Sequence, residues 1–432
     1  MSPFLMGGES STIQTMINWA IMLAIFMFVL PKLYFYQIFS KLDLSAKKLE
    51  ALSEKGQKIL LDRTEKFTPS KKTAKGILNN FIDFFMIPPV SLDPFGIVKK
   101  LEHMIDQGEK RFKDVAKQMA PKANLEQQMN VDMGLQAATM LHTLAKIVRH
   151  FVETAKKFKN LQIAMIIQMQ LPIIEKMAEA EFDGMETFLK GMPIGDAAGP
   201  LTIASLVDKE GKEIAPDVIA VTEKRWGRNI TFMKAKGPGG RLGKLGKAVE
   251  NACKGKKIAK IITIDAAQKL EGEKTGSVAE GIGVAMGGPG VQKSQIEDVA
   301  VRLGIPVDAI AIKMSSFQAI KPMPIKVLNA IDKAKDILRQ KVEDAPKGSN
   351  IVVIGVGNTC GIPNTNKSLN TIKEAIKREA RRKKEEEEKK QKRGFFNKPK
   401  KSDYEDDEDT PSTPLTSLGM FMSFMHSRIF RG

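Results

Sequence analysis

The sequence predicts an all-helical half followed by an α/β half, anchored to a membrane by one N-terminal transmembrane helix. Three observations predict this fold class. An uncharged apolar run occupies residues 13–30, helical apolar periodicity covers residues 95–189, and from residue 217 short β-branched runs alternate with helical segments. Strands that alternate with helices form mostly parallel sheets with helices on both faces, so we expect a three-layer α/β domain.

The composition fits a folded protein in a reducing compartment with an excess of positive charge. The 432 residues, 42% of them hydrophobic, suffice for two or three domains with their own cores. The two cysteines, Cys253 and Cys360, stand far apart, which argues against a disulfide framework or a cysteine-based zinc site. A net charge of +18 favours anionic partners. Because much of the excess sits in a few Lys/Arg-rich segments, we do not expect nucleic-acid binding.

The run from Ile13 to Leu30 carries no charge and is long enough to cross a bilayer as a helix. No small-residue cleavage site follows it, which favours a retained anchor over a removable signal peptide. Lysines follow the run and none precedes it, so the positive-inside rule predicts a single-pass protein of the cell membrane. Residues 1–12 would then lie outside, residues 13–37 in the bilayer, and the bulk of the chain in the cytoplasm.

Residues 38–92 are expected to form a basic juxtamembrane connector that can lie on anionic lipid headgroups. Within it, residues 76–87 are either an interfacial amphipathic segment or a segment that docks onto the next domain. Residues 93–190 are expected to form a helical domain of three helices. The third helix is very apolar over residues 161–174, which allows a second membrane span, but its shortness and its glutamines favour a buried core helix.

The remaining boundaries follow from changes in composition. Residues 191–216 are rich in glycine and proline at their start, and we expect a junction loop that either links two domains or lies beside a functional site. The α/β domain should cover residues 217–365. A charged helix should follow over residues 366–393. The acidic and apolar tail, residues 394–432, has the composition of a disordered segment.

Three loops follow the predicted strands at the edge where parallel strands end. The first, KGPGGRLGK at residues 236–244, opens into a helix, and its candidate ligand-binding residues are Gly237, Gly239, Gly240, Arg241, Gly243 and Lys244. Glycine amides at a helix N-terminus with two basic side chains can hold a phosphate group. A tight turn with solvent-facing basic residues explains the same pattern. The loop is not a Walker A motif, because Pro238 and Leu245 occupy positions that need Gly and Ser/Thr.

The second loop begins at Asp265 and continues through Glu271 and Glu273 into a run of glycines that ends at residue 290. These three carboxylates are the candidate catalytic residues, because a carboxylate at a strand end can act as a general base, metal ligand or ribose acceptor. The third loop supplies Gly357 and Asn358, both of which tolerate positive φ, as further ligand-binding candidates. The sequence names no cofactor and predicts no metal cluster.

Four motifs resemble an archaeal family of membrane proteins known only as a domain of unknown function. They are GMPIGDAAGPL, KAKGPGGRLGK, IDAAQKLEGEKTGSVAEGIGVAMGGPGV and VIGVGNT, within residues 85–380. The resemblance implies membrane association, but it does not indicate any activity. A weaker likeness links Asp265 and the Gly357-Asn358 turn to the fold of the germination protease and hydrogenase-maturation peptidases. The order of these two motifs is reversed here, and no histidine lies in the α/β domain.

Three functions fit these features. The first is a membrane-anchored cytosolic α/β protein that binds a phosphate-bearing or other small anionic ligand as a regulatory module, through residues 237–244 and Asp265. The second is a peptidase-like hydrolase that uses Asp265 with Glu271 or Glu273, through a carboxylate or a metal. The third is a membrane-tethered assembly scaffold built on the helices. The sequence leaves the oligomeric state open.

Overall fold

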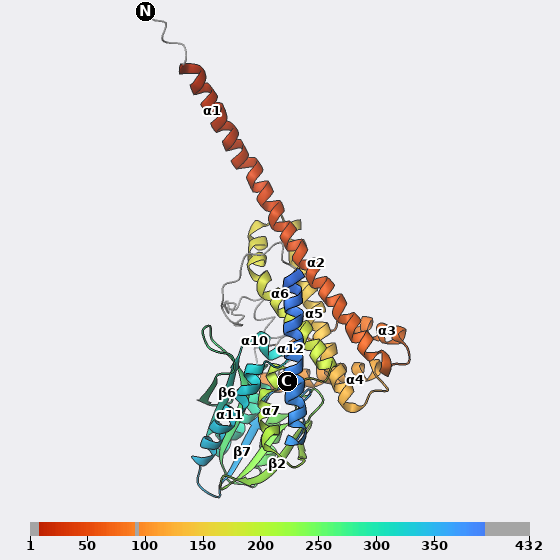
Figure 1. Cartoon of the computed structure of the whole chain (residues 1–432), viewed down its shortest axis with the longest axis vertical. Coiled ribbons are helices and arrows are strands. Elements are labelled where there is room, and N and C mark those ends of the chain that lie inside the picture. The colour runs from red at the N-terminus through yellow and green to blue at the C-terminus, as the bar shows by residue number, and fades with distance from the viewer. Residues whose placement is uncertain (1–7, 91–94, 394–432) are drawn as a thin grey trace, which may run out of the picture.

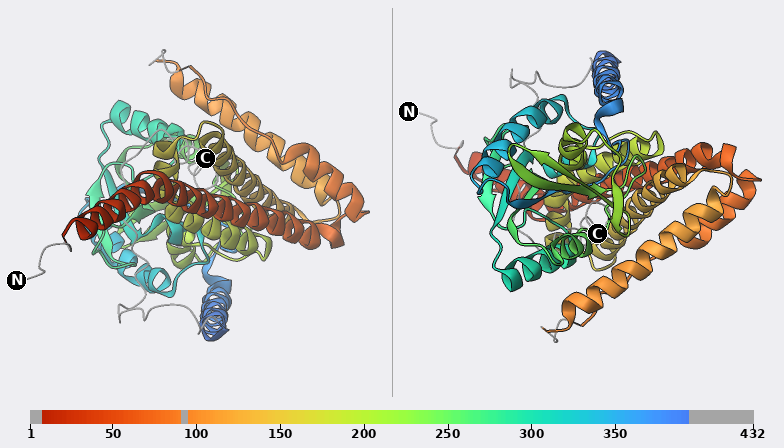
Figure 2. Two further views of the ribbon diagram at one scale, coloured as in Figure 1. Left: turned by 90° about the horizontal axis from the view of Figure 1, so that it is seen from above. Right: turned by 90° about the horizontal axis from the view of Figure 1, so that it is seen from below.

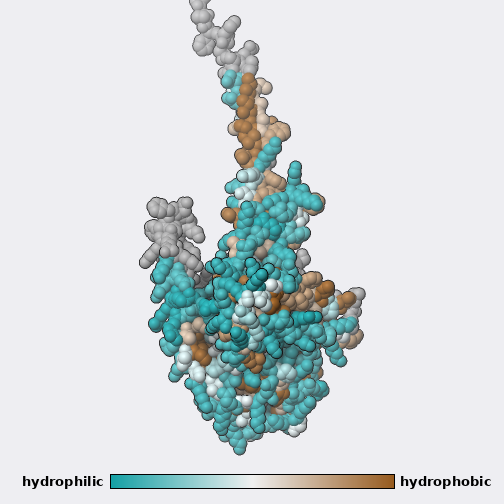
Figure 3. All heavy atoms as spheres, turned by 90° about the vertical axis from the view of Figure 1, so that its right-hand side faces the viewer, coloured by the Kyte–Doolittle hydropathy of each residue, from teal (hydrophilic) through white to brown (hydrophobic). Residues whose placement is uncertain are grey.

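The computed structural model describes residues 8–90 and 95–393, and an apolar helix projects from the body of the protein (Figure 1). This helix consists of α1 (Gly8–Ala24), a π-helical turn (Ile25–Val29) and α2 (Leu30–Thr64). Its large apolar side chains between Met16 and Leu30 are exposed, and they form the apolar surface seen in Figure 3. Among the described residues, this is the one helix long and apolar enough to cross a membrane. The finding is consistent with the predicted anchor.

The predicted connector does not begin with a break in the helix, because α2 continues into the protein and becomes part of a helical domain. Its other helices are α3 (Lys71–Phe81), α4 (Ile97–Met119), α5 (Leu125–Lys157) and α6 (Leu161–Leu189). Asn124 begins α5 with a capping box, and Asn160 caps α6. Seen along the vertical axis of Figure 1, α2 crosses over α5 and α6 while α4 forms the outer edge (Figure 2).

The structure decides both alternatives left open for the helical half. Leu78 is buried, and the Phe81 and Phe84 rings pack edge-on against Phe112, so the segment around α3 docks onto the helical domain. In α6, Ala164 and Leu171 belong to the same hydrophobic core as α2 and α5. The apolar start of α6 is therefore a core helix, as its length predicts.

The predicted junction loop is more structured than expected. It contains a 3₁₀ turn (Gly195–Ala197), helix α7 (Ala198–Leu206) and the edge strand β1 (Lys212–Ala215). Eight of the nine residues of α7 are buried, so no polar face marks it as a helix in the sequence. The loop interpretation was wrong for this part, because a short helix buried all round has no amphipathic period.

Within the described part of the chain, seven strands form one sheet, in which they lie in the order β1-β2-β3-β7-β4-β6-β5. The strands are β2 (Val218–Arg225), β3 (Arg228–Ala235), β4 (Ile258–Gln268), β5 (Val278–Ile282), β6 (Val307–Met314) and β7 (Asn350–Gly355). Neighbours among β3, β7, β4 and β6 are parallel, whereas β1, β2 and β5 pair antiparallel at the edges. The mostly parallel sheet is thus confirmed, although β5 lies within the glycine-rich stretch that we interpreted as a loop.

Helices cover both faces of the sheet, as predicted. Helices α7, α11 (Ile325–Glu343) and α12 (Leu369–Arg393) pack on one face, and α8 (Leu245–Cys253) and α9 (Val291–Leu303) pack on the other. The charged helix α12 also reaches the helical domain, where Glu379 pairs with Lys190 at 3.3 Å and Lys383 pairs with Asp183 at 2.8 Å. The predicted tail at residues 394–432 and the first seven residues lie outside the described residues.

The adjacent strands β4 and β7 lead to opposite faces of the sheet, since β4 is followed by α9 and β7 by α12. Such a switch point usually leaves a crevice at the carboxyl ends of the strands. Here the backbone of residues 195–199 lies in that position. A Cβ atom at Gly199 would lie 2.3 Å from the carbonyl oxygen of Ile264 and 2.4 Å from that of Val356. Only glycine allows this close approach.

We predict that Gly199→Ala destabilises the full chain by about 3 kcal/mol, because the added methyl group would force apart the ends of β4 and β7. Urea unfolding of the detergent-solubilised protein, followed by circular dichroism, measures this loss. Gly281→Ala is the matched control, since a Cβ atom there meets nothing within 4 Å. Equal stability of the two variants would show that residues 195–199 do not depend on this contact.

Candidate functional site

Buried polar side chains gather where residues 195–199 meet the end of β7. The Oδ2 atom of Asp196 accepts a hydrogen bond of 2.8 Å from the backbone N–H of Asn358, and both side chains are buried. Gly357 adopts a φ of 132°, and a Cβ atom there would lie 2.0 Å from the carbonyl oxygen of Asp196. The predicted Gly357-Asn358 turn therefore holds Asp196 in place at the carboxyl end of β7, the central strand of the sheet.

The three candidate catalytic carboxylates lie in different surroundings. Asp265 is buried within β4, on the face that bears Thr263 and packs against the α8–α9 layer. Glu271 is exposed. Glu273 accepts a hydrogen bond of 2.6 Å from the backbone N–H of Leu270 and lies 3.6 Å from Lys313 Nζ. Within the described part of the chain, no cluster of three or more His, Cys, Asp or Glu residues could hold a metal ion.

The glycine loop after β3 binds a carboxylate, and this carboxylate belongs to the chain itself. Glu126, in the first turn of α5, accepts hydrogen bonds from the Gly239 N–H and from both Nη atoms of Arg241, at 2.7 and 3.2 Å. The neighbouring Gly240 N–H donates to Asn130 Oδ1 at 3.0 Å. Gly239 and Arg241 thus bind an internal carboxylate, and these contacts, with that of Gly240, join the α/β domain to the helical domain.

Lys244 also reaches across to the helical domain. Its Nζ lies 2.6 Å from Asp106 and 3.4 Å from Glu109, both on α4. Burial disfavours the charged amine, but these two carboxylates outweigh it and raise the pKa of Lys244. Helix α8 begins at the next residue, and its Gly246 N–H donates to Gln292 Oε1 at 2.9 Å. Lys244 therefore carries its charge at the boundary between the two domains.

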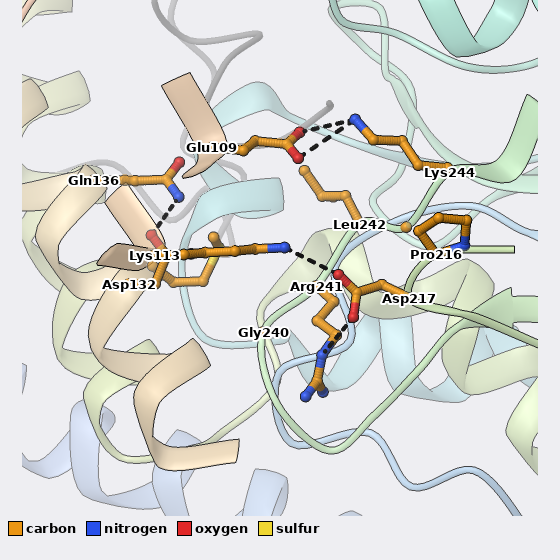
Figure 4. Close-up of a pocket in the computed structure, with 12 residues that line it drawn as sticks. Glu109, Lys113, Asp132, Gln136, Pro216, Asp217, Gly240, Arg241, Leu242 and Lys244 are labelled. Carbon is orange, nitrogen blue, oxygen red and sulfur yellow. Dashed lines mark hydrogen bonds and ion pairs between the residues drawn. The ribbon is translucent and has the colours of Figure 1, made fainter. Parts of the chain in front are cut away.

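A pocket of roughly 110 Å³ lies between these ion pairs (Figure 4). Its lining residues are Glu109, Lys113, Asp132, Met133, Gln136, Pro216, Asp217, Gly240, Arg241, Leu242, Gly243 and Lys244. Asp217, which adopts a φ of 58°, lies 3.0 Å from Lys113 Nζ and 3.2 Å from Arg241 Nε. The structure therefore brings four predicted binding residues together in one pocket, whereas Asp265 does not line it.

Asp132 is the one buried carboxylate in the lining of this pocket. It projects from α5 and accepts a hydrogen bond of 2.9 Å from Gln136 Nε2. Burial raises the pKa of Asp132 to about 7, with the Gln136 hydrogen bond opposing the shift. The carboxyl group therefore gains or loses its proton near neutral pH, so it can either donate or accept a hydrogen bond in the pocket.

The sequence analysis missed the contribution of the helical half to this site. Glu126 lies 115 residues before Arg241, and no local pattern links them. Asp132 did offer a signal, because it is an acidic residue on an otherwise apolar helical stretch. Lys234 was missed as well. It is buried at the end of β3, burial lowers its pKa to about 7, and its Nζ donates to Asn364 Oδ1 at 3.2 Å.

We predict that Glu126→Ala lowers the free energy of unfolding by about 2 kcal/mol, because it removes the bidentate partner of a guanidinium that is only 2% exposed. Chemical denaturation of the detergent-solubilised chain measures the loss. Glu250→Ala, which removes an exposed partner 3.5 Å from Arg302, should cost less than about 1 kcal/mol. Similar losses in both variants would contradict a special role for Glu126.

We also predict a pH dependence of stability from Asp132. Its pKa is higher in the folded than in the unfolded chain, so the folded state binds more protons and loses stability as pH rises. Between pH 5 and pH 7, the free energy of unfolding should fall by about 2 kcal/mol more in wild type than in Asp132→Asn. Denaturation curves of both proteins at the two pH values test this. Parallel pH profiles would rule out a buried, titrating Asp132.

Comparison with known proteins places this site across two sequence domains. Residues 16–191 match the N-terminal domain of a protein family of unknown function, DUF1512, and residues 194–363 match its C-terminal domain. The boundary coincides with the turn between α6 and residues 195–199. No curated protein and no solved structure matches, and the archaeal origin and the peptidase likeness stay predictions. The two matches together cover most of the chain, which therefore belongs to the DUF1512 family.

Proposed function

We propose that this protein is a membrane-anchored regulatory module that binds a small phosphate-bearing or other anionic ligand between its helical and α/β domains. The supporting observation is the pocket at this boundary, where the glycine loop and the cationic Lys113, Arg241 and Lys244 meet. A pocket of roughly 110 Å³ has room for several water-sized groups, which is enough for a phosphoryl group. The rest of a larger ligand would lie outside.

The pocket is lined by three basic and three acidic side chains, so an anionic ligand would enter it by taking the place of a carboxylate. Lys113 and Lys244 are each held by carboxylates of the other domain, so an anionic ligand can replace Asp217 or Glu109 as their partner. The guanidinium of Arg241 pairs with Asp217 (Figure 4) and also with Glu126, and it would stay there. Asp132 in its protonated form can donate to the ligand, and deprotonation would add repulsion.

Replacement of these ion pairs gives the ligand its regulatory effect. The pairs of Lys113 with Asp217 and of Lys244 with Asp106 and Glu109 connect α4 to the α/β domain. A ligand that engages both lysines changes the strength of this connection. It therefore shifts the population toward the arrangement of the two domains that it binds better. With the N-terminus outside and the bulk in the cytoplasm of the cell, the ligand would be a cytosolic compound.

The test is thermal unfolding of the full chain in detergent against inorganic phosphate, nucleotides and sugar phosphates. A ligand at 100 times its dissociation constant should stabilise the protein by about 2.7 kcal/mol. Lys113→Ala and Lys244→Ala should each weaken binding by about 10-fold or more, because each removes a charge-assisted hydrogen bond.

Binding should also depend on pH through Asp132. The affinity for inorganic sulfate, whose charge is constant, should be higher at pH 6 than at pH 8, and Asp132→Asn should remove this difference.

Lys236→Ala is the matched control, because Lys236 lies on the same loop but pairs with Glu213 and does not line the pocket. Binding that survives both pocket substitutions and is lost in Asp265→Asn would move the site to the end of β4. Stabilisation by none of the compounds would refute the proposal and favour the scaffold alternative.

A further inference from the structure

One face of the α5–α6 hairpin is apolar and exposed, although α6 is a core helix. Ala164, Ile167 and Leu171 of α6 are buried, but Met165, Ile166 and Met169 on its other side are 43%, 59% and 74% exposed. Phe158, at the turn between the helices, is 68% exposed. The buried residues account for the core, and the exposed ones need a different explanation.

Ion pairs between α2 and α6 show that the exposed apolar face of α6 lies beside the part of α2 that emerges from the helical domain. Lys48 of α2 pairs with Glu175 and Glu179 of α6, which lie 127 and 131 residues later. Further along α2, a Cβ atom at Gly56 would lie 3.4 Å from Met185 of α6, so the two helices run in the same direction where they pack. At a sequence offset midway between these two separations, Met165 and Ile166 of α6 lie beside Tyr36 of α2. Tyr36 is six residues beyond Leu30, or about 9 Å along the helix. Tyr36 also lies near the end of the predicted bilayer segment, residues 13–37, so this face is level with the boundary of the predicted bilayer.

The turn of the hairpin reaches still closer to the apolar run. By the same offset, Leu161 lies level with Lys32, and Phe158 precedes it in the turn. Two exposed lysines, Lys157 and Lys159, flank Phe158, and Lys157 Nζ lies 5.9 Å from the centre of its ring. An exposed aromatic residue between lysines, with methionine and isoleucine beside it, suits an interface that is apolar inside and anionic at its surface.

We propose that the α5–α6 hairpin is a second membrane contact, which inserts Phe158, Met165, Ile166 and Met169 into the headgroup layer beside the anchor. The proposal rests on the proposed membrane anchoring through α1. The occupant is the lipid surface, because this apolar face lies beside the exposed apolar helix and its basic rim complements anionic headgroups. The hairpin and the anchor together fix the tilt of the helical domain on the membrane.

The experiment places single fluorophores on the full chain in vesicles of phosphatidylcholine and phosphatidylglycerol that carry nitroxide quenchers on the headgroup and along the acyl chain, because Leu23 lies near the middle of the apolar run and the hairpin near its end. Ile166→Cys tests the hairpin, Leu23→Cys tests the anchor, and Val301→Cys on α9 is the control, because Val301 is an exposed apolar residue of the α/β domain. The two native cysteines are buried. The labels at Ile166 and Leu23 should be quenched, and the label at Val301 should not. Met169→Cys should repeat the result for Ile166.

The outcomes separate the two proposals. Quenching at Leu23 without quenching at Ile166 or Met169 would overturn the hairpin contact and leave the anchor in place. Absence of quenching at Leu23 would overturn the anchor, and the hairpin contact with it. A label at Ile166 that is shielded from both the lipid quencher and aqueous iodide would show a protein on this face, such as a second copy, and would also overturn the proposal.

Discussion

The structure depends on the direct contact between the backbone of residues 195–199 and the ends of β4 and β7. At Gly199 the nearest atoms are carbonyl oxygens of both strands, and at Gly357 the nearest atom is the carbonyl oxygen of Asp196. No side chain separates these backbones, so neither can move without the other. Because only residues 190–194 separate residues 195–199 from α6, this contact fixes the helical domain to the place in the sheet where an α/β protein usually binds its ligand.

The second connection between the domains has a different character. Arg241, Lys244 and Lys113 join the loop after β3 and the turn at Asp217 to α4 and α5 through ion pairs around a pocket. Close backbone packing and the buried Arg241 pair allow little adjustment, whereas the partly exposed pairs of Lys113 and Lys244 can exchange partners at smaller cost. The molecule thus has a fixed contact at the centre of the sheet and an adjustable one at the loop after β3. This difference makes the pocket the better place for a ligand to act.

The parts of the structure that were predictable are those with a local signal. The uncharged run from residue 13 to 30, the cap at Asn124 and the β-branched strand around Ile262 each have a pattern within a few residues. Helix α7 was missed because nearly all of it is buried, and β5 was missed because glycines occupy an edge strand. In the candidate site, Arg241 was predicted to bind an anionic ligand, and its internal partner Glu126 was not predicted. That pairing is set by tertiary packing over 115 residues, which a local pattern does not contain.

Helix α5 links the two proposed functional regions. Its first turn carries Glu126, its second carries Asp132, and its last residues precede the exposed Phe158. Over 33 residues the helix is about 50 Å long, and its buried residues fall on successive turns along most of that length. A helix packed in this way moves as one body. A change in the protonation of Asp132 would therefore act on the same helix that carries the proposed membrane-contacting hairpin. In this arrangement the pocket and the proposed lipid contact lie at the two ends of α5, and α2, which continues from the predicted anchor, packs against α5 between them.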